Sequence, residues 1–384
     1  MEIDIELYRN REQSFIKHQF LTKYLKPAAY KTLLGYSSTF NFVDAFAGPW
    51  KVSDDAKYSD ASFEQAISTL EEVKADLQSK GMEAITMRFC LCERRPEAVE
   101  LLREYAKERT AVEIYVFEGD FEDNLERIAE KIPNGFTFSF IDPTGWDLRN
   151  EKIFQFLRDR TKSGRGEFLL NFMAEHINRH AEYDKVEDSF GRFLAFPDWT
   201  VEFGELRKSL SSEEAILRLL KVKMRETGVA KYVPDLSIMI PRVEKVKMRL
   251  ILGTHSPKGL ALFRDIQEKV ERQEIEMRGK IKEGDSLQVS MFSALEIAEI
   301  LQKSKGVGCK RYQLLAEEQV KSLLTGRPFV KFGTIAIHVM DALPMRLTHI
   351  NKLLVDLKKR GIVTFVLPGR ETVPKDETRI SLSS

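Results

Sequence analysis

The sequence predicts an α/β protein in which a mostly parallel sheet is followed by a smaller helical, winged-helix-like module. Two observations support this prediction. Through the first part of the 384 residues, short apolar runs rich in aromatic and β-branched residues alternate with helical stretches, the pattern of βαβ units. Towards the C-terminus this alternation stops, and two helical stretches are followed by one short strand and a loop.

The strands expected in the first part are short and mainly apolar. They lie at residues 39–44, 87–92, 112–117, 136–141 and 167–173. Helical stretches are expected at residues 14–25, 62–79, 93–108 and 118–132. Strands separated by helices pair in parallel, because a parallel pair needs a long crossover connection.

The pattern loosens after residue 182. A helix is expected at residues 212–226, two late strands at 232–240 and 247–253, and a further helix at 259–276. The segment at 278–285 is polar and contains two glycines, which is typical of a connection between domains. We therefore assign residues 1–276 to a first domain and residues 277–384 to a second.

Charge is distributed unevenly between these regions. The whole chain carries 60 Lys and Arg against 59 Asp and Glu, which excludes a uniformly basic coat protein or an acidic disordered chain. Residues 301–384 alone carry 15 Lys and Arg against 7 Asp and Glu. This local excess predicts a polyanionic partner, with a solvated lysine-rich surface as the alternative.

The cellular location is predicted from features that the sequence lacks. No apolar run approaches the roughly 18 residues of a membrane span, and no signal peptide is recognisable. The 3 cysteines form neither a disulfide framework nor a C-x-x-C site. We expect a cytoplasmic protein that makes no membrane contact.

Acidic residues end or follow four of the predicted strands, at Asp44, Glu93, Asp120 and Asp142. Ligands of parallel α/β sheets bind outside the carboxyl ends of the strands. A carboxylate after the second strand suits the two hydroxyls of a ribose, and one after the third suits an exocyclic amine. Each residue taken alone is better explained as a helix cap, but the four in order predict a nucleoside site.

The segment DAFAG at residues 44–48 resembles the D-x-F-x-G opening of nucleic-acid methyltransferases of class I, which use S-adenosylmethionine. The resemblance implies a Rossmann-like methyltransferase sheet of seven strands with S-adenosylmethionine as cofactor. The cofactor-binding residues that it implies are Asp44, Phe46 and Gly48 for the methionine end, Glu93 for the ribose, and Asp120 with Phe121 for the adenine.

Asp142 and Pro143 stand where amino-methyltransferases carry a D-P-P-aromatic motif. In that motif the aspartate side chain and the proline carbonyl hold and orient a target amine, which is catalysis by positioning. Trp146 is the aromatic residue expected to stack on a base. No Pro-Cys pair follows the fourth strand, so cysteine-dependent methylation of cytosine is not expected.

Five segments in order resemble the three-Cys-motif partner protein family, a bacterial and phage-associated, methyltransferase-like group. They are KHQFLTKYL, FVDAFAGP, FIDPTGW, LLNFMAEHINR and GTHSPKGLALF, within about residues 15–263. The resemblance implies a protein with a three-cysteine motif as a possible partner.

The C-terminal segment resembles a winged helix. Helices at residues 334–340 and 347–360 are joined by a turn and followed by a strand at 362–367 and a loop. Nucleic acid, DNA or RNA, is expected to contact Arg346, Thr348, Asn351 and Lys352 at the start of the second helix, and Lys358, Lys359, Arg360 and Arg370 through phosphates. The alternative is a winged helix that docks a protein.

Other polar residues are expected to have structural or surface roles. His176 and His180 have the spacing of metal ligands on a helix, but no third ligand is recognisable, so no metal is expected. Lys17 and His18 stand on a helix that passes near the cofactor in the methyltransferase fold, which leaves a role with its carboxylate open, but a surface pair is the favoured expectation. Asn171, near the end of an apolar strand, either faces the target site or caps a helix.

Two departures from the motifs bear on activity. Trp50 stands where a second glycine is usual, so it either obstructs the methionine end of the cofactor or closes over it. Thr144 and Gly145 replace the second proline and the aromatic residue. The leading prediction is an enzyme that transfers a methyl group from S-adenosylmethionine to an amine of a nucleic-acid base. The alternative is a catalytically silent member that binds nucleic acid or a partner protein.

Overall fold

A computed structural model of the chain describes residues 5–49, 53, 57–143, 145, 148–174, 187–196, 198–283, 296, 299–300 and 310–383. The chain divides into two compact units, Met1–Ser256 and Pro257–Ser384. Trp50, Thr144, Trp146, His176 and His180, on which several sequence predictions depend, lie outside the described residues.

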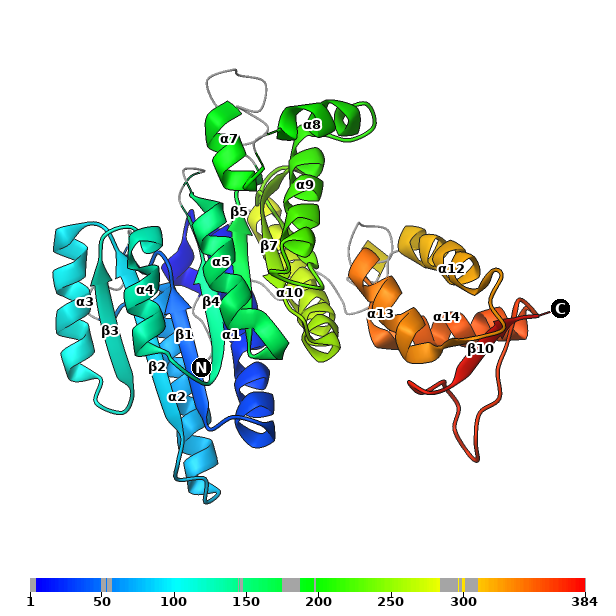
Figure 1. Cartoon of the computed structure of the whole chain (residues 1–384), viewed down its shortest axis with the longest axis horizontal. Helices are drawn as coiled ribbons and strands as arrows, with labels where there is room; N and C mark the ends of the chain where they lie inside the picture. The colour runs from blue at the N-terminus through cyan, green and yellow to red at the C-terminus, as the bar shows by residue number, and fades with distance from the viewer. Residues whose placement is uncertain are drawn as a thin grey trace. The chain divides into compact units, whose positions relative to one another are not determined.

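The first unit is built around a seven-stranded sheet in the order β3-β2-β1-β4-β5-β7-β6 (Figure 1). Its strands are β1 (Thr39–Asp44), β2 (Thr86–Glu93), β3 (Glu113–Glu118), β4 (Phe136–Ile141), β5 (Gly166–Phe172), β6 (Asp235–Met239) and β7 (Val246–Gly253). The strands β1 to β5 pair in parallel, and β7 is antiparallel to both of its neighbours. This sheet confirms the predicted α/β class and the Rossmann-like methyltransferase arrangement.

The inner strands are covered on both faces, which explains why their sequences are almost continuously apolar. Every residue of β4 is buried, and in β1 only Thr39 is not. The rings of Phe42 and Phe138 stack across β1 and β4 with their centroids 6.2 Å apart. Tyr24, from the first long helix, packs on Phe138 at 5.7 Å. Aromatic packing of this kind stabilises the pairing of β1 with β4 beyond the area that it buries.

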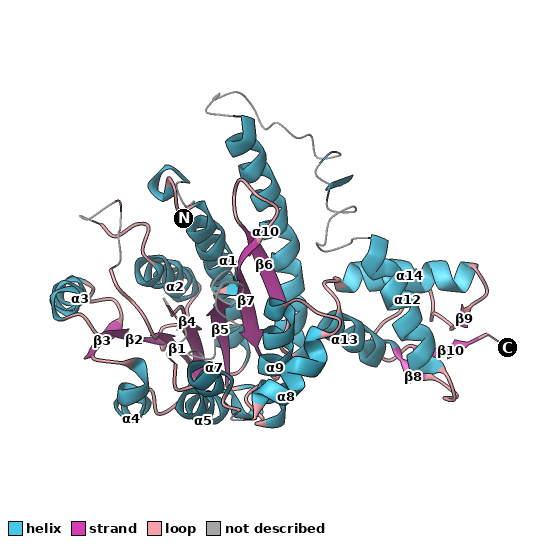
Figure 2. Cartoon of the chain, turned by 90° about the horizontal axis from the view of Figure 1, so that it is seen from above, coloured by secondary structure: helices cyan, strands magenta, loops and turns pink. Residues whose placement is uncertain are grey.

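Helices cover both faces of the sheet (Figure 2). The helices α1 (Glu12–Gly35) and α2 (Ser62–Ser79) lie on one face, and α4 (Phe121–Lys131) and α5 (Asn150–Thr161) lie on the other. Further helices of this unit are η1 (Ile5–Tyr8), α3 (Pro96–Glu108), η2 (Lys162–Gly164), α7 (Glu187–Leu194), α8 (Trp199–Arg207) and α9 (Ser212–Glu226). Nowhere in the described part of the chain is a helix both long and apolar enough to cross a membrane.

The helix α1 is longer than the expected 14–25 and contains Pro27. A proline inside a helix removes one hydrogen bond and usually ends or kinks it. Here Ala28, Ala29 and Leu33 beyond the proline are buried, so tertiary packing carries the helix through to Gly35.

The strand order of the sheet reverses at β1, because β2 lies on one side of it and β4 on the other. At such a reversal, the chain leaves two neighbouring strands in opposite directions. A crevice therefore opens outside the carboxyl ends of these strands. Asp44 ends β1, Glu93 ends β2, and Asp142 directly follows β4. The fold therefore brings three of the predicted strand-end residues to the same edge of the sheet.

The second unit contains α10 (Pro257–Glu283), α12 (Lys310–Leu324), α13 (Phe332–Ala342) and α14 (Leu347–Lys359). A small antiparallel sheet in the order β8-β10-β9 is formed by β8 (Val330–Lys331), β9 (Val363–Thr364) and β10 (Arg379–Leu382). Val320, Val339, Leu354 and Ile380, from three helices and β10, are buried in its core. Both expected C-terminal helices are present, and the strand expected at 362–367 is reduced to β9.

The two units divide earlier in the chain than the expected boundary after residue 276. The helix α10 runs through Arg278 and Gly279 to Glu283 and belongs to the second unit. Within that unit, Nε of Arg264 on α10 donates to the Met340 carbonyl of α13 at 2.9 Å. Lysine, arginine and glutamate favour helix and one glycine costs only about 1 kcal/mol, so the polar segment does not interrupt α10.

Gly253 allows close packing between β7 and β5. A Cβ built on Gly253 lies 1.9 Å from Cε1 of Phe168, its directly paired and fully buried neighbour on β5. We expect Gly253→Ala to lower the free energy of unfolding by roughly 1–3 kcal/mol, because the surrounding core must shift. Urea unfolding curves measure the change.

Gly204→Ala on α8 is the matched control, since nothing lies within 4 Å of its added Cβ. It should leave the unfolding midpoint unchanged or raise it. Equal midpoints for the Gly253 and Gly204 variants would contradict the prediction.

Candidate functional site

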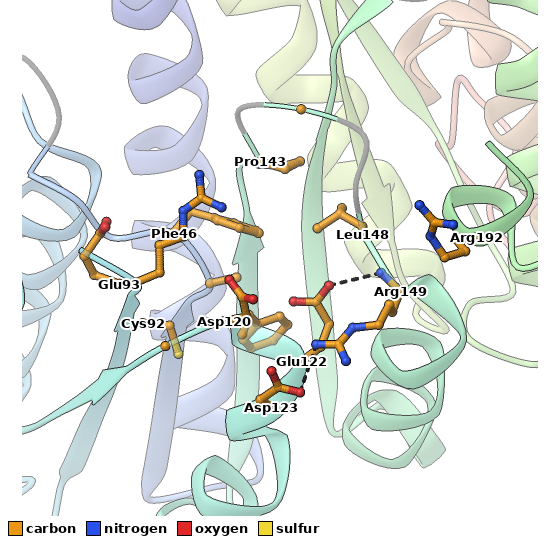
Figure 3. Close-up of a pocket in the computed structure, with 15 residues that line it drawn as sticks. Phe46, Cys92, Glu93, Asp120, Glu122, Asp123, Pro143, Leu148, Arg149 and Arg192 are labelled. Carbon is orange, nitrogen blue, oxygen red and sulfur yellow. Dashed lines mark hydrogen bonds and ion pairs between the residues drawn. The ribbon is translucent and has the colours of Figure 1, made fainter. Parts of the chain in front are cut away.

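A cavity of about 650 Å³ lies outside the carboxyl ends of β1, β2, β3 and β4 (Figure 3). Its lining comes from the four strand ends, the start of α4, the segment that leads to α5, and Arg192 of α7. The predicted site residues that line it are Phe46, Glu93, Asp120, Phe121 and Pro143. The sheet thus brings five separately predicted residues to one cavity.

The loop after β1 folds back onto the end of β2. Gly48 has a φ of +83°, a left-handed conformation that residues with a Cβ adopt poorly. Its N–H donates to Oε2 of Glu93 at 3.2 Å, and the Ala47 N–H donates to the Cys92 carbonyl at 2.8 Å. Gly48 therefore shapes the cavity through the turn and through Glu93.

Glu93 lines the cavity with only 1% of its side chain exposed. Besides the Gly48 N–H, its carboxylate accepts from the backbone N–H of Arg95 at 2.9 Å and from Nε of Arg95 at 3.0 Å. A carboxylate has about four acceptor positions, so about one remains for a ligand. The predicted contact with both ribose hydroxyls therefore requires Arg95 to release one of its bonds.

Asp120 immediately precedes α4, and its side chain is exposed at the cavity. It makes no capping hydrogen bond to α4, and no residue in the described ranges pairs with its carboxylate. The geometry therefore does not support the alternative of a helix cap. Phe121 also lines the cavity, but it is 1% exposed and packs edge-on against Phe156 at 5.9 Å, so the cavity shares this ring with the core.

Further charged groups of the cavity are mostly paired. Glu122 accepts from the backbone N–H of Arg149 at 3.0 Å, and Asp123 accepts from Nη2 of Arg149 at 2.9 Å. Arg94 is exposed beside Glu93 and has no hydrogen-bond partner among the described residues. Among the described residues that line the cavity, a ligand would therefore meet Asp120 as the unpaired carboxylate and Arg94 as the unpaired cation.

A second polar group, the strand-end cluster, consists of Lys17, Asp44, Asp142 and Asn171. Nζ of Lys17 on α1 contacts Oδ2 of Asp142, and Nδ2 of Asn171 donates to Oδ1 of Asp142 at 2.6 Å. In the register of β1 and β4, Asp44 is paired with Phe140, and Phe140 lies two residues before Asp142 in the sequence. Because side chains alternate along a strand, both aspartates lie on the same face of the sheet.

Asp44 is fully buried and accepts two hydrogen bonds, from the Ser62 hydroxyl at 2.8 Å and the Phe46 N–H at 3.1 Å. The pKa of Asp44 is raised to about 7, because the effect of burial exceeds that of the two hydrogen bonds, which lower the pKa. The charge of Asp142 raises this pKa further, and the charge of Lys17 lowers it. Asp44 supports the loop at Phe46 and does not itself line the cavity.

The expectation that Lys17 and His18 form a surface pair is wrong, because they are only 8% and 5% exposed. Nδ1 of His18 and the Tyr8 hydroxyl share a hydrogen bond of 2.8 Å. Burial lowers the pKa of His18, and the charges of Lys17 and Arg11 lower it further. A signal was present in the sequence, since a polar triplet stands between apolar pairs in one helix and part of it must face the sheet.

The residues predicted to bind nucleic acid fall into two groups in the second unit. Three of them make contacts within the unit. Arg346 forms ion pairs with Asp265 and Glu268, and Arg360 forms ion pairs with Glu317 and Asp356. Nζ of Lys358 donates to the Phe365 carbonyl at 2.7 Å. The side chains of Thr348, Lys352, Lys359 and Arg370 are exposed, and Asn351 is half-buried. The structure therefore leaves fewer basic groups available than the sequence suggests.

No protein-family profile and no curated protein matches the chain. Among solved structures it is similar to protein LPL1258 from Legionella pneumophila, of the DUF519 family, with 14% identity over 69% of this chain and 92% of that one and a TM-score of 0.42. It is also similar to a loganic acid methyltransferase with SAH, with 9% identity over 79% of this chain and 92% of that one and a TM-score of 0.30. Likeness at this level concerns the fold, and the resemblance to the three-Cys-motif partner family stays a prediction.

The raised pKa of Asp44 makes the stability of the fold depend on pH. Its pKa is about 7 in the folded protein against an ordinary value of 3.8, so the folded state binds the proton more tightly than the unfolded state. Stability is therefore lost as the pH rises from the lower value to the higher one. Relative to Asp44→Asn, we expect the wild-type free energy of unfolding to fall by roughly 2–4 kcal/mol between about pH 4.5 and pH 8.

Urea unfolding at several pH values measures this difference. Asp76→Asn is the control, since hydrogen bonds from Lys80 and Tyr30 lower the pKa of Asp76, which is then ionised throughout this range, and it should show a constant difference from the wild type. A constant difference for Asp44→Asn as well would mean that Asp44 is charged in both states throughout this range.

Proposed function

We propose that the chain is a methyltransferase that binds S-adenosylmethionine in the cavity and methylates an amine of a nucleic-acid base. One observation carries this proposal: Glu93 and Asp120 line the same cavity as Pro143, beside Asp142, at the reversal of the sheet order. A single acidic strand end is common in α/β proteins. Glu93 and Asp120 line the cavity at the ends of two strands, and Asp142, after a third strand, does not line it but precedes the lining residue Pro143. These three positions match the parts of a nucleoside and its acceptor.

The cavity has the size and chemistry for this cofactor. Its volume of about 650 Å³ is typical of small-molecule sites. Asp120, unpaired among the described residues, would accept from the adenine amine, and the remaining acceptor position of Glu93 would take a ribose hydroxyl. Phe46 and Leu148 supply apolar walls for the cofactor. When bound, the cofactor supplies an electrophilic methyl group on a positively charged sulfur.

Asp142 is the residue proposed to hold the acceptor amine. Lys17 and Asn171 each bond one of its oxygens, which leaves about one lone pair on each oxygen. An amine N–H that donates to this carboxylate is held while the nitrogen lone pair stays free to attack. The Pro143 carbonyl, next in sequence, would accept the second N–H, so the chemistry is mainly one of positioning.

The second unit supports a nucleic-acid acceptor. Its order of elements, α12-β8-α13-α14-β9-β10, agrees with the winged helix predicted from the sequence, in which α14 would enter a groove. Thr348, Lys352 and Lys359 are exposed and spaced by four and seven residues, so they share one face of α14. Arg370, in the loop between β9 and β10, would add a phosphate contact. Arg346 and Arg360 are not proposed to contact nucleic acid, because both form ion pairs within the unit.

A second candidate is a non-catalytic protein that retains the cavity. It is favoured by one observation, that both oxygens of Asp142 already accept donors from the fold, as in an aspartate with a structural role. The replacement of the second proline and aromatic residue by Thr144 and Gly145 points in the same direction. In that case the second unit binds the partner, or the partner is the three-Cys-motif protein that the resemblance implies.

Two matched substitutions separate cofactor binding from methyl transfer. Asp120→Asn removes an acceptor for the adenine and should weaken binding of S-adenosylhomocysteine about tenfold. Asp142→Asn should leave this affinity within about twofold but slow methyl transfer at least about 100-fold, because its contact acts on the acceptor. Isothermal titration calorimetry gives the affinities, and transfer of a labelled methyl group to mixed DNA and RNA gives the rates.

Asp76→Asn is the control for both measurements, since Asp76 is paired with Lys80 at the end of α2 and does not line the cavity, and it should change neither. Binding by the wild type without transfer to any nucleic acid would select the non-catalytic candidate. Failure of the wild type to bind S-adenosylmethionine or S-adenosylhomocysteine would overturn the methyltransferase proposal.

Replacing Lys352, Lys359 and Arg370 together by Gln tests the nucleic-acid part of the proposal. Each phosphate contact contributes about 0.9 to the slope of log affinity against log salt, so the slope for duplex DNA should fall by up to about 2.7. Fluorescence anisotropy with the full chain at several salt concentrations measures it. The control replaces Lys26, Lys80 and Lys208 of the first unit by Gln, an equal change of charge. An unchanged slope would assign the second unit to protein docking.

A further inference from the structure

Lys17 is buried near the carboxyl ends of the central strands. Its side chain is 10% exposed and does not line the cavity, and its Nζ contacts Oδ2 of Asp142. Lysine is almost never buried without a partner. Even with one, the free energy lost with its hydration can exceed the free energy that a single ion pair returns. The sequence thus retains a costly group at the point where the proposed acceptor would bind.

Asp142 is held from two independent elements. Lys17 reaches its Oδ2 from α1, and Asn171 donates to its Oδ1 from β5, the strand next to β4. Two donors on opposite oxygens fix the plane of a carboxylate as well as its position. Neither donor comes from a residue that lines the cavity, so the arrangement is complete before any ligand binds.

Lys17 also acts on a second carboxylate. Asp44 lies on the same face of the sheet as Asp142, and the negative charge of Asp142 raises the pKa of Asp44 while the positive charge of Lys17 lowers it. The other groups that face Asp44 are the Ser62 hydroxyl from α2, the Phe46 N–H and, on β2, Cys92. Among these groups Lys17 supplies the positive charge, and a nearby cation lowers the cost of ionising two neighbouring carboxylates together.

We propose that Lys17 is a positioning residue of the acceptor site, which fixes the orientation of Asp142 and serves as the counter-ion that Asp142 and Asp44 share. This role rests on the proposed methyl transfer, because it is the acceptor amine that the fixed carboxylate would hold. Lys17 acts through Asp142 and touches neither cofactor nor acceptor. Replacing Lys17 should therefore lower the turnover and shift the titration of Asp44, while the affinity for the cofactor stays unchanged.

The test compares Lys17→Met with Lys17→Arg. Lys17→Met keeps the length of the side chain and removes the charge. It should lower kcat at least tenfold, leave the affinity for S-adenosylhomocysteine within twofold, and raise the pKa of Asp44 measured by carbon-13 NMR of the carboxyl group. Lys17→Arg keeps the charge and should restore the wild-type titration of Asp44 and most of kcat. Lys26→Met is the control on the same helix, since Lys26 is 46% exposed and pairs with Glu72 on α2.

An unchanged kcat and an unchanged Asp44 titration in Lys17→Met would overturn the proposal. If the wild type transfers no methyl group, the proposed function fails, and the Asp44 titration still decides whether Lys17 is the shared counter-ion. Asn171→Leu separates orientation from charge: it should lower kcat and leave the Asp44 titration at its wild-type value. Should Lys17→Met not fold, Lys17→Gln, which keeps a hydrogen-bond donor without the charge, should shift the Asp44 titration in the same direction.

Discussion

The strand β1 is hydrogen-bonded to β2 on one side and to β4 on the other, and the position of every site residue in the first unit depends on these two ladders. Their register pairs Asp44 with Leu91 and with Phe140, so the three strands end almost level and open onto one crevice. A slip of one residue in β1 would turn Asp44 to the opposite face and separate it from Lys17. The stacked rings of Phe42 and Phe138 oppose such a slip, which links the aromatic core directly to the geometry of the site.

The polar residues at this crevice form a set whose members depend on one another. Asp44 is fully buried, Glu93 has 1% of its side chain exposed, and each is held by backbone N–H groups of the loop that follows its own strand. An ionised group left unpaired in such a place costs several kcal/mol, whereas paired groups cost much less. Glu93 also accepts from Gly48, so the loop after β1 and the end of β2 are stabilised as one unit.

The presence of the first strands and the position of their ends could be predicted from the sequence, because buried parallel strands leave continuous apolar runs that stop at Asp44, Glu93 and Asp142. The side-chain partners could not. Lys17 lies 125 residues from Asp142 in sequence, and nothing local to either residue indicates that α1 crosses the end of β4. The same reason explains why the sequence predicts a helix only to residue 25. Beyond Pro27, tertiary packing rather than local helix preference sustains α1.

The second unit shows why a count of charges overestimates the basic surface. Arg346 stands at the start of α14, where an arginine suits a groove of DNA, yet Asp265 and Glu268 from α10 hold it inside the unit. Long-range ion pairs of this kind cannot be read from a local sequence window, because both partners appear as ordinary surface residues. Of the basic residues predicted to bind nucleic acid, Lys352, Lys359 and Arg370 stay exposed, but so do Lys310, Arg311, Arg327 and Lys375 on other parts of the unit. The exposed positive charge of this unit is therefore spread over several elements, and neither its excess nor its position selects one binding face.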